Sequence, residues 1–321
     1  MRRVCILGGG PAGTSAAIAA RRNGSPVTII ERSRFPRHKV CGEFFSPGIQ
    51  DALGRLDLWS AFLDLKPSII RRMLIRIGSA EKSETLPQPA FGLSRYTFDS
   101  WLWNTALTLG AQSAAAGAAS IVTTGRASTR SRGGRLFGFK AHFDGPADDA
   151  VELYFAGATY VGVNCVEDGA TNVCGLAPEE QLRQHAFDVD TMIWRDPAVS
   201  ARLAPLTRKW DWIFTGPLEF GNQFRSKQEV YVAGDALSFV DPFTGSGLLC
   251  AVLTGTLAGE SAAQSVPVDR YLQQCSDLLK QPFGFSSILR KIASTRAAGP
   301  LLQVMPSSLI FRLTRPAHPV V

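Results

Sequence analysis

The chain has 321 residues, of which 45% are hydrophobic and 19% charged, and its formal net charge is +7. This composition is typical of a globular protein and excludes a disordered or fibrous one. The basic excess favours anionic ligands such as cofactor phosphates, but no aromatic-plus-basic module occurs, so we expect no nucleic-acid binding.

The first thirty residues predict a βαβ unit. A buried strand over residues 4–7, a small-residue helix over 11–22 and a second strand over 27–30 follow one another. The apolar run before the glycines has four residues, too short for the core of a secretory signal. No stretch of about 18 apolar residues occurs elsewhere. We therefore expect a cytoplasmic protein, with at most a peripheral contact to a membrane.

The loop inside this unit has the GxGxxG spacing of dinucleotide-binding proteins. The three glycines allow a tight turn, close approach of backbone to a pyrophosphate, and close helix–strand packing. The acid after the second strand accepts hydrogen bonds from a ribose diol and favours FAD or NAD over NADP. A glycine-rich loop without a ligand is the alternative. The expected cofactor-binding residues here are Gly8, Gly10, Pro11, Ala12, Gly13, Glu31 and Arg32.

The next stretch, KVCGEFFSPG over residues 39–48, places a cation, a thiol and an acid close together. Lys39 favours the thiolate form of Cys41, whereas Glu43 opposes it. We take Lys39, Cys41 and Glu43 as candidate catalytic residues, and a purely structural loop is the alternative. Cys41 differs from the other five cysteines, which lie in apolar contexts and are expected to be free core thiols.

Residues 69–78 and the region from about 132 to 220 predict strands of an antiparallel sheet. In RLFGFKAHF, Phe137, Phe139, Ala141 and Phe143 share one face, while Lys140 and His142 share the other. Lys140 and His142 are further catalytic candidates that would line a substrate pocket, although we favour a solvated strand face for them. Trp210 and Trp212 are expected in the core or in a pocket wall. The four histidines lack metal-ligand spacing, so no metal is expected.

A second glycine cluster follows a short strand over residues 230–233. Gly234 and Asp235 come at the end of that strand, and a long helix of small residues then begins. This order fits a flavin: Asp235 would hold the ribityl chain, and the helix N-terminus would face the pyrimidine ring, where negative charge develops on reduction. A simple turn after the strand is the alternative. The expected cofactor-binding residues here are Gly234, Asp235, Pro242, Gly245, Ser246, Gly247 and Leu248.

Four stretches together resemble one flavoprotein group. They are GGGPAG with its later acid, KVCGE, SRYTFDSWLWNTALTLGA and VYVAGDALSFVDPFTGSG. The chain is similar to the geranylgeranyl reductases and p-hydroxybenzoate hydroxylase-like proteins (glutathione reductase type 2), a group that includes relatives of flavin-dependent halogenases. The resemblance implies FAD, with Cys41 and Gly42 running under the isoalloxazine. It also implies that Arg95, ahead of a helix over about 97–109, approaches the cofactor; a surface cation is the alternative.

The chain departs from the group at two points. Residues 112–121 leave little room for the β-meander that covers the adenine end of FAD, which puts the affinity for FAD in doubt. No second GxGxxG occurs, so we expect NAD(P)H to bind transiently or a reduced electron-carrier protein to deliver electrons.

The predicted fold is α/β: a Rossmann-like FAD-binding parallel sheet, an inserted antiparallel substrate sheet and C-terminal helices. The FAD domain is expected at 1–68, 92–130 and 226–264. The substrate-side sheet would take 69–91 and 131–225, and an apolar helical cover 265–321.

The resemblance favours an FAD-dependent oxidoreductase. Its first form is a geranylgeranyl reductase-like enzyme that transfers hydride from reduced FAD to a small apolar unsaturated substrate, with Cys41 or a nearby acid assisting protonation. Its second is a hydroxylase or halogenase-like monooxygenase that activates O2 as a flavin hydroperoxide. A non-catalytic FAD-binding or electron-relay protein is the third alternative.

Overall fold

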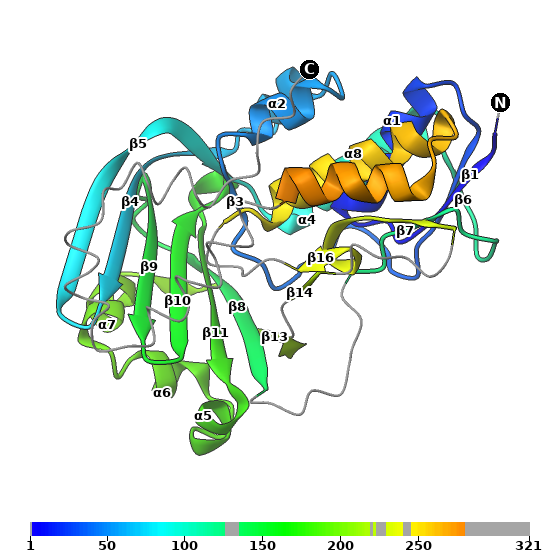
Figure 1. The fold of residues 1–321 in the computed structure, drawn as a ribbon. Coiled ribbons are helices and arrows are strands. Elements are labelled where there is room, and N and C mark those ends of the chain that lie inside the picture. Colours follow the sequence, from blue (N-terminus) through cyan, green and yellow to red (C-terminus); the bar gives the residue numbers. More distant parts are fainter. Residues whose placement is uncertain (1, 126–134, 219–220, 223–228, 240–244, 280–321) are drawn as a thin grey trace.

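The computed structural model describes residues 2–125, 135–218, 221–222, 229–239 and 245–279. Figure 1 shows a small parallel sheet covered by long helices and, beside it, a large sheet built mainly from the middle of the chain. Pro242 and most of the expected C-terminal cover, residues 280–321, lie outside the described residues; residues 268–279 are helical.

The parallel sheet has the strand order β15-β7-β1-β2-β6, and every pair in it is parallel. The first βαβ unit has the predicted bounds. The glycine loop follows its first short apolar strand directly, and a turn precedes the second, so little freedom is left in where the strands begin and end. Residues 112–122 hold two short strands and no meander. The strands are β1 (Val4–Leu7), β2 (Val27–Ile30), β6 (Gln112–Ser113), β7 (Ile121–Val122) and β15 (Tyr231–Val232).

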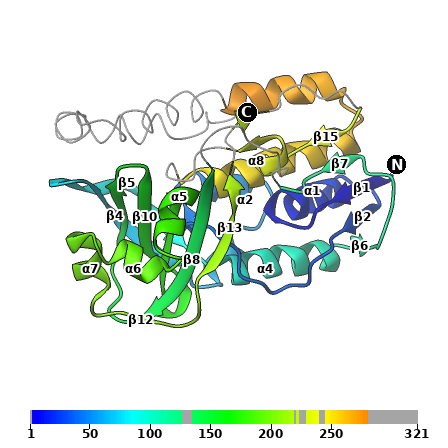
Figure 2. The ribbon, with the colours of Figure 1, turned by 90° about the horizontal axis from the view of Figure 1, so that it is seen from below.

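Three helices pack on this sheet: α1 (Pro11–Arg22), α4 (Arg95–Thr108) and α8 (Gly247–Ala263). Helix α1 lies between the other two (Figure 2). The carbonyl of Ala12 lies against Gly255, and that of Ala16 lies against Gly259. Because both pairs are four residues apart in the same order, α1 and α8 run parallel and their N-termini point the same way.

This crossing also sets an offset between the two helix starts. Helix α8 begins eight residues before Gly255, whereas α1 begins one residue before Ala12. The difference of seven residues corresponds to about 10 Å along the helix axis. The N-terminus of α8 therefore lies beyond that of α1, toward the large sheet.

The large sheet is mixed rather than purely antiparallel. Its order is β12-β8-β11-β10-β9-β4-β5-β3, with β13 also paired to β8, and the β4–β9 pair is parallel. The chain passes through α4 and the parallel sheet between β4 and β9, and such a long crossover permits a parallel pair. The strands are β3 (Phe44–Phe45), β4 (Ser68–Ile77), β5 (Ala80–Gly92), β8 (Leu136–Asp144), β9 (Ala150–Ala156), β10 (Thr159–Cys165), β11 (Thr171–Pro178), β12 (Thr207–Arg208) and β13 (Ile213–Leu218).

One face of β8 packs on three short helices, α5 (Glu179–Gln184), α6 (Val189–Ile193) and α7 (Pro197–Leu203). Phe139 and Phe143 are buried there, and the ring of Trp212 lies 5.6 and 5.8 Å from theirs. The remaining short elements are α2 (Ile49–Gly54), α3 (Trp59–Leu63), the 3-10 turns Glu167–Gly169 and Gly234–Ala236, and the strand pair β14 (Gly221–Asn222) and β16 (Ser238–Phe239).

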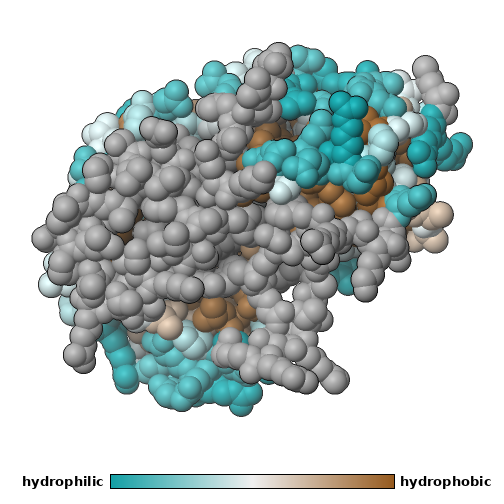
Figure 3. Space-filling view, viewed as in Figure 1, coloured by the Kyte–Doolittle hydropathy of each residue, from teal (hydrophilic) through white to brown (hydrophobic). Residues whose placement is uncertain are grey.

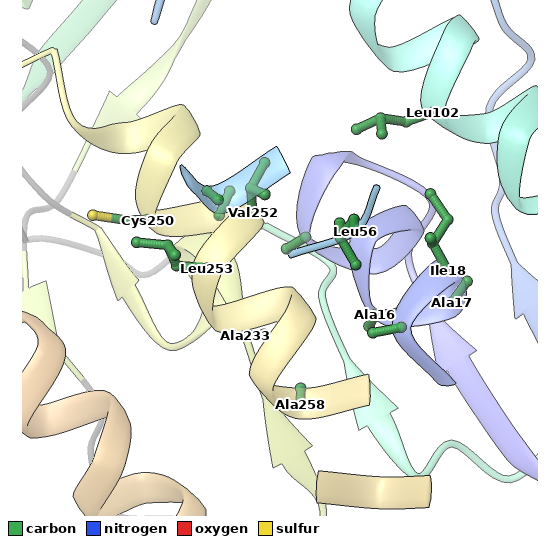
Figure 4. Close-up of a cluster of buried hydrophobic side chains, with 14 of the residues drawn as sticks. Ala16, Ala17, Ile18, Leu56, Leu102, Ala233, Cys250, Val252, Leu253 and Ala258 are labelled. Carbon is green, nitrogen blue, oxygen red and sulfur yellow. The ribbon is translucent and has the colours of Figure 1, made fainter. Parts of the chain in front are cut away.

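The main core lies between α1, α8 and α4. Small side chains such as Ala16 and Ala258 allow the helices to approach, and Leu102 of α4 packs from the other side (Figure 4). Hydrophilic residues follow the outer edge of the described surface in Figure 3, while hydrophobic ones show mostly deeper between them. No helix in the described ranges is both long enough and apolar enough to cross a bilayer.

We expect Gly259→Ala to destabilise the protein by about 1–3 kcal/mol, because the added methyl group collides with the backbone of Ala16. The matched control is Gly54→Ala, also in a helix, where no described atom lies within 4 Å of the new methyl group. Urea unfolding followed by circular dichroism measures both. Equal stability of the two variants would contradict the close α1–α8 crossing.

Candidate functional site

The glycine loop leaves open space at the start of α1. Gly8 has φ of +108°, and it packs with Gly13 against Thr123. At Gly10, by contrast, an added Cβ would meet no described atom within 4 Å. The first turn of α1 has no acidic residue and no side-chain cap. Its free N–H groups and partial positive charge therefore suit a phosphate.

Glu31 lies beside this loop as an ionised acceptor. It accepts hydrogen bonds from the N–H of Gly9 at 2.7 Å and of Ser33 at 2.8 Å, and Arg37 lies 3.7 Å away. Burial opposes ionisation, but these N–H groups and Arg37 lower the pKa of Glu31 overall. An ionised carboxylate at this place is compatible with the predicted ribose contact, which stays a prediction. Arg32 follows it and is exposed.

The start of α8 offers a second open helix N-terminus. Gly247 has no described atom within 4 Å of an added Cβ, and the first turn has no acid and no side-chain cap. Ser246 and Leu248 beside it are buried. Gly234, with φ of +64°, donates its N–H to Thr254 of α8 at 3.0 Å. Strand β15 and the start of α8 therefore meet, as the second glycine cluster predicts.

Together these features fit an extended dinucleotide such as FAD. The N-termini of α1 and α8 point the same way with an offset of about 10 Å. Glu31 follows β2, and Asp235 follows β15 in the same parallel sheet. Carboxylates at strand ends next to helix N-termini are the usual surroundings of such cofactors.

The segment over residues 39–48 lies between these helices and the large sheet. Gly245, with φ of +66°, packs on the ring of Phe44, and Gly48 packs on Leu249 of α8. On the other side, the amide of Asn172 donates to the carbonyls of Cys41 at 3.2 Å and Gly42 at 2.9 Å. The segment thus joins the two halves of the molecule.

Glu43 is the centre of a buried ionic cluster. Its carboxylate pairs with Lys140 and, at 2.7 Å, with Nε2 of His142. It also accepts a hydrogen bond from the backbone N–H of Arg95 at 2.6 Å. Glu43 and Lys140 are 0% exposed and His142 is 5% exposed. The expectation of a solvated strand face for Lys140 and His142 is wrong, because the 39–48 segment covers that face of β8.

The alternation along β8 explains how the cluster forms. Residues two apart share a face of a strand, so Lys140 and His142 project together, opposite Phe139. Glu43 meets them from a backbone with φ of +52°, which non-glycine residues rarely adopt. Burial raises the pKa of Glu43, but Lys140 and then His142 lower it overall. Glu43 is therefore an anion that holds two potential proton donors.

Arg95 and Cys41 lie next to this cluster. Arg95 forms a buried two-point pair with Asp99, at 2.6 and 2.7 Å. Burial lowers the pKa of Arg95, but Asp99, followed by Cys41, raises it overall. The positive charge of Arg95 in turn lowers the pKa of Lys39. The negative charge of Asp235 acts to raise that pKa, but the net change is a lowering. Lys39, Cys41 and Arg95 thus share one electrostatic environment, which the sequence did not indicate for Arg95. The Cys41 sulfur lies toward Arg95 and its own loop, where it accepts a hydrogen bond from the backbone N–H of Glu43 at 3.4 Å.

Several residues at the site had no distinguishing signal in the sequence. The ring of His38 lies 4.9 Å from that of Tyr96, 4.7 Å from that of Trp210 and 5.3 Å from that of His142. This aromatic group borders the ionic cluster, which makes Trp210 a wall residue. Burial raises the pKa of the nearby Cys174 to about 12, with a further contribution from Cys41, so Cys174 is an inert thiol.

Comparison with known proteins agrees with this geometry. Residues 3–36 match the family model "FAD dependent oxidoreductase". The flavin-dependent brominase Bmp2 superposes with a TM-score of 0.78 at 16% identity, covering 98% of this chain and 93% of that one. A geranylgeranyl bacteriochlorophyll reductase-like protein from Thermoplasma acidophilum gives 0.67 at 18% identity, covering 97% and 90%. The fold is that of the FAD-dependent oxidoreductases.

Curated proteins match this chain over short segments. The 6-methylpretetramide 4-monooxygenase of Streptomyces rimosus is 47% identical over 57 residues, 17% of this chain and 14% of the relative. The menaquinone reductase of Mycolicibacterium smegmatis is 34% identical over 86 residues, 27% of this chain and 20% of the relative. The chain thus aligns with no more than a fifth of these relatives.

We expect Lys140→Met to destabilise the protein by about 3–5 kcal/mol, because it leaves the buried Glu43 carboxylate without its cation. In a Glu43→Gln background the same change should cost much less, since no buried anion is left unpaired. Urea unfolding of the four proteins gives the coupling. Lys209→Met is the control: it breaks an exposed pair with Asp144 and should change stability by less than about 0.5 kcal/mol. Additive effects would contradict the cluster.

The lowered pKa of Glu43 also predicts a pH dependence. A carboxyl whose pKa is lower in the folded state stabilises the fold above its unfolded pKa of about 4.3, and this contribution is lost as the pH falls through the folded pKa. The stability difference between the unaltered protein and Glu43→Gln should therefore be constant from pH 7 to about 5 and shrink at lower pH. Urea unfolding at several pH values measures it, and a difference that grows on acidification would contradict the shift.

Proposed function

We propose that the protein is an FAD-dependent oxidoreductase that transfers hydride to an apolar unsaturated substrate of the isoprenoid-quinone kind. The observation that carries this proposal is the Glu43–Lys140–His142 cluster. Lys140 and His142 belong to β8 of the large sheet, whereas Glu43 belongs to the 39–48 segment that packs on the start of α8. A cofactor groove and a buried acid–base group thus meet at one boundary.

Different residues of the chain would have different roles in this reaction. Once reduced by the electron donor, bound FAD would supply a hydride to one carbon of the substrate double bond, and the neighbouring carbon would take a proton from a residue of the chain. Glu43 is ionised and so positions Lys140 and His142 rather than donating the proton itself. His142, Lys140 and the thiol of Cys41 are the candidate donors. Lys39 and Arg95 add positive charge beside the flavin end of the groove, where reduction places negative charge.

The substrate class rests on two likenesses. The KVCGE run is similar to that of geranylgeranyl reductases, and two of the curated relatives are menaquinone reductases. Menaquinone carries both a quinone ring and an unsaturated side chain, so a relative that reduces it is consistent with hydride transfer to a lipid. Such a substrate resides in a membrane, and the proposal therefore includes a transient peripheral contact with one. The electron donor is NAD(P)H or a reduced carrier protein.

A monooxygenase is the second candidate. The 47% match to a monooxygenase and the superposition on a flavin-dependent brominase favour it. In that case the site would hold a reduced flavin that activates O2, and the buried cluster would serve an aromatic substrate instead. An FAD-binding or electron-relay protein without a substrate of its own is the remaining alternative.

Anaerobic turnover distinguishes these candidates. The purified protein is loaded with FAD, reduced without oxygen and mixed with menaquinone. We expect the flavin absorbance to return without O2, together with a product two hydrogens heavier that survives exposure to air, as a reduced side chain does and a reduced ring does not. Menaquinone with a saturated side chain is the control. A product that requires O2 and gains an oxygen atom would support the monooxygenase, and a failure to bind FAD would overturn both.

A further inference from the structure

The adenosine end of the proposed FAD groove holds an aromatic pair that the dinucleotide fingerprint does not explain. Trp103 of α4 lies over Gly9, the middle residue of the glycine loop. A Cβ added to Gly9 would lie 2.7 Å from the indole ring and 3.0 Å from the Cβ of Glu31. Trp103, the glycine loop and the ribose-binding acid therefore meet at one place.

Phe35 extends this surface. Its ring centroid lies 5.2 Å from that of Trp103 with an interplanar angle of 37°. The guanidinium of Arg37 lies 5.3 Å from the centroid of the Phe35 ring and donates to the hydroxyl of Ser33 at 2.5 Å. The Nε of Arg37 is buried and has no hydrogen-bond partner among the described residues. Arg37 also lies 3.7 Å from Glu31, so its positive charge is close to the ribose-binding acid.

Helix α4 places Trp103 at the adenosine end. Arg95, Asp99 and Trp103 are spaced at four-residue intervals and so share one face of the helix. Arg95 lies at the Glu43 cluster, while Trp103 lies eight residues further along, about 12 Å away, beside Glu31. This face of α4 therefore runs from the flavin end of the groove to the adenosine end.

The position of Trp103 matters because the connection between α4 and β7 is short. Residues 112–122 contain the two-residue strands β6 and β7, with no meander to cover the adenine. Trp103 and Phe35 are both half-buried, so each keeps accessible ring surface. Aromatic side chains with a free face are suited to stacking on a purine base.

We propose that Trp103 and Phe35 form an adenosine platform that replaces the missing cover and makes the protein select FAD over FMN. Glu31 binds the ribose, and the guanidinium of Arg37 beside it adds positive charge near the adenosine phosphate. This inference rests on the proposed function and deepens it, since it states which part of the cofactor the chain recognises by stacking.

Flavin affinity tests the platform without any turnover. FAD and FMN are titrated into the apoprotein, and binding is followed by flavin fluorescence and by quenching of tryptophan emission. The unaltered protein should bind FAD more tightly than FMN. Trp103→Ala should weaken FAD about ten- to a hundredfold, the loss of one stacked base, and leave FMN within about twofold. Trp103→Phe should retain most of the FAD affinity because it keeps an aromatic face.

The controls separate stacking from folding and from the proposed function. Trp194→Ala removes an exposed indole outside this cluster and should leave the affinity for both flavins unchanged. If Trp103→Ala leaves FAD binding unchanged, or weakens FAD and FMN equally, the platform is overturned while the proposed function stands. If the unaltered protein binds neither flavin, the proposed function fails, and the platform with it.

Discussion

The close parallel crossing of α1 and α8 is the constraint on which the rest of the structure depends. Two glycines of α8, Gly255 and Gly259, lie so close to the carbonyls of Ala12 and Ala16 that no larger side chain fits at either position. The crossing holds two helix N-termini in one direction, offset by about 10 Å. A cofactor with a central pyrophosphate and a reducible ring further along suits such a pair of positive ends. The position of the two helix N-termini therefore follows from helix packing rather than from any single residue.

The buried ionic cluster is the second organising interaction, and it acts between the two sheets. Glu43 comes from the N-terminal part of the chain, whereas Lys140 and His142 come from β8. Removing three polar groups from water is expensive, so the cluster is stable only while the 39–48 segment stays in place. This couples the order of that segment, which carries Cys41 and Gly42, to the docking of the large sheet. The proposed acid–base chemistry and the integrity of the domain boundary thus depend on the same contacts.

Helix α4 connects these two features. Its first residue, Arg95, donates its N–H to Glu43, and its face continues past Asp99 to Trp103 at the glycine loop. One helix therefore contacts the proposed site at both ends of the cofactor. In a chain that has lost the meander, such a helix is well placed to recognise the adenosine as well as to position the flavin.

The sequence alone determined the local elements and the cofactor class. The glycine spacing, the strand before it and Glu31 after it specify a βαβ unit because each glycine has a separate steric role. The alternation of Phe139 and Lys140 likewise assigned the two faces of β8. The tertiary structure decided what covers those faces. Lys140 and His142 are polar and were expected in solvent. They are instead buried against Glu43, about a hundred residues earlier in the chain. The pairing of β4 with β9 and the approach of Trp103 to Gly9 were decided in the same way. Contacts between distant segments depend on how whole elements dock, and the periodicity of a single segment carries no record of its partner.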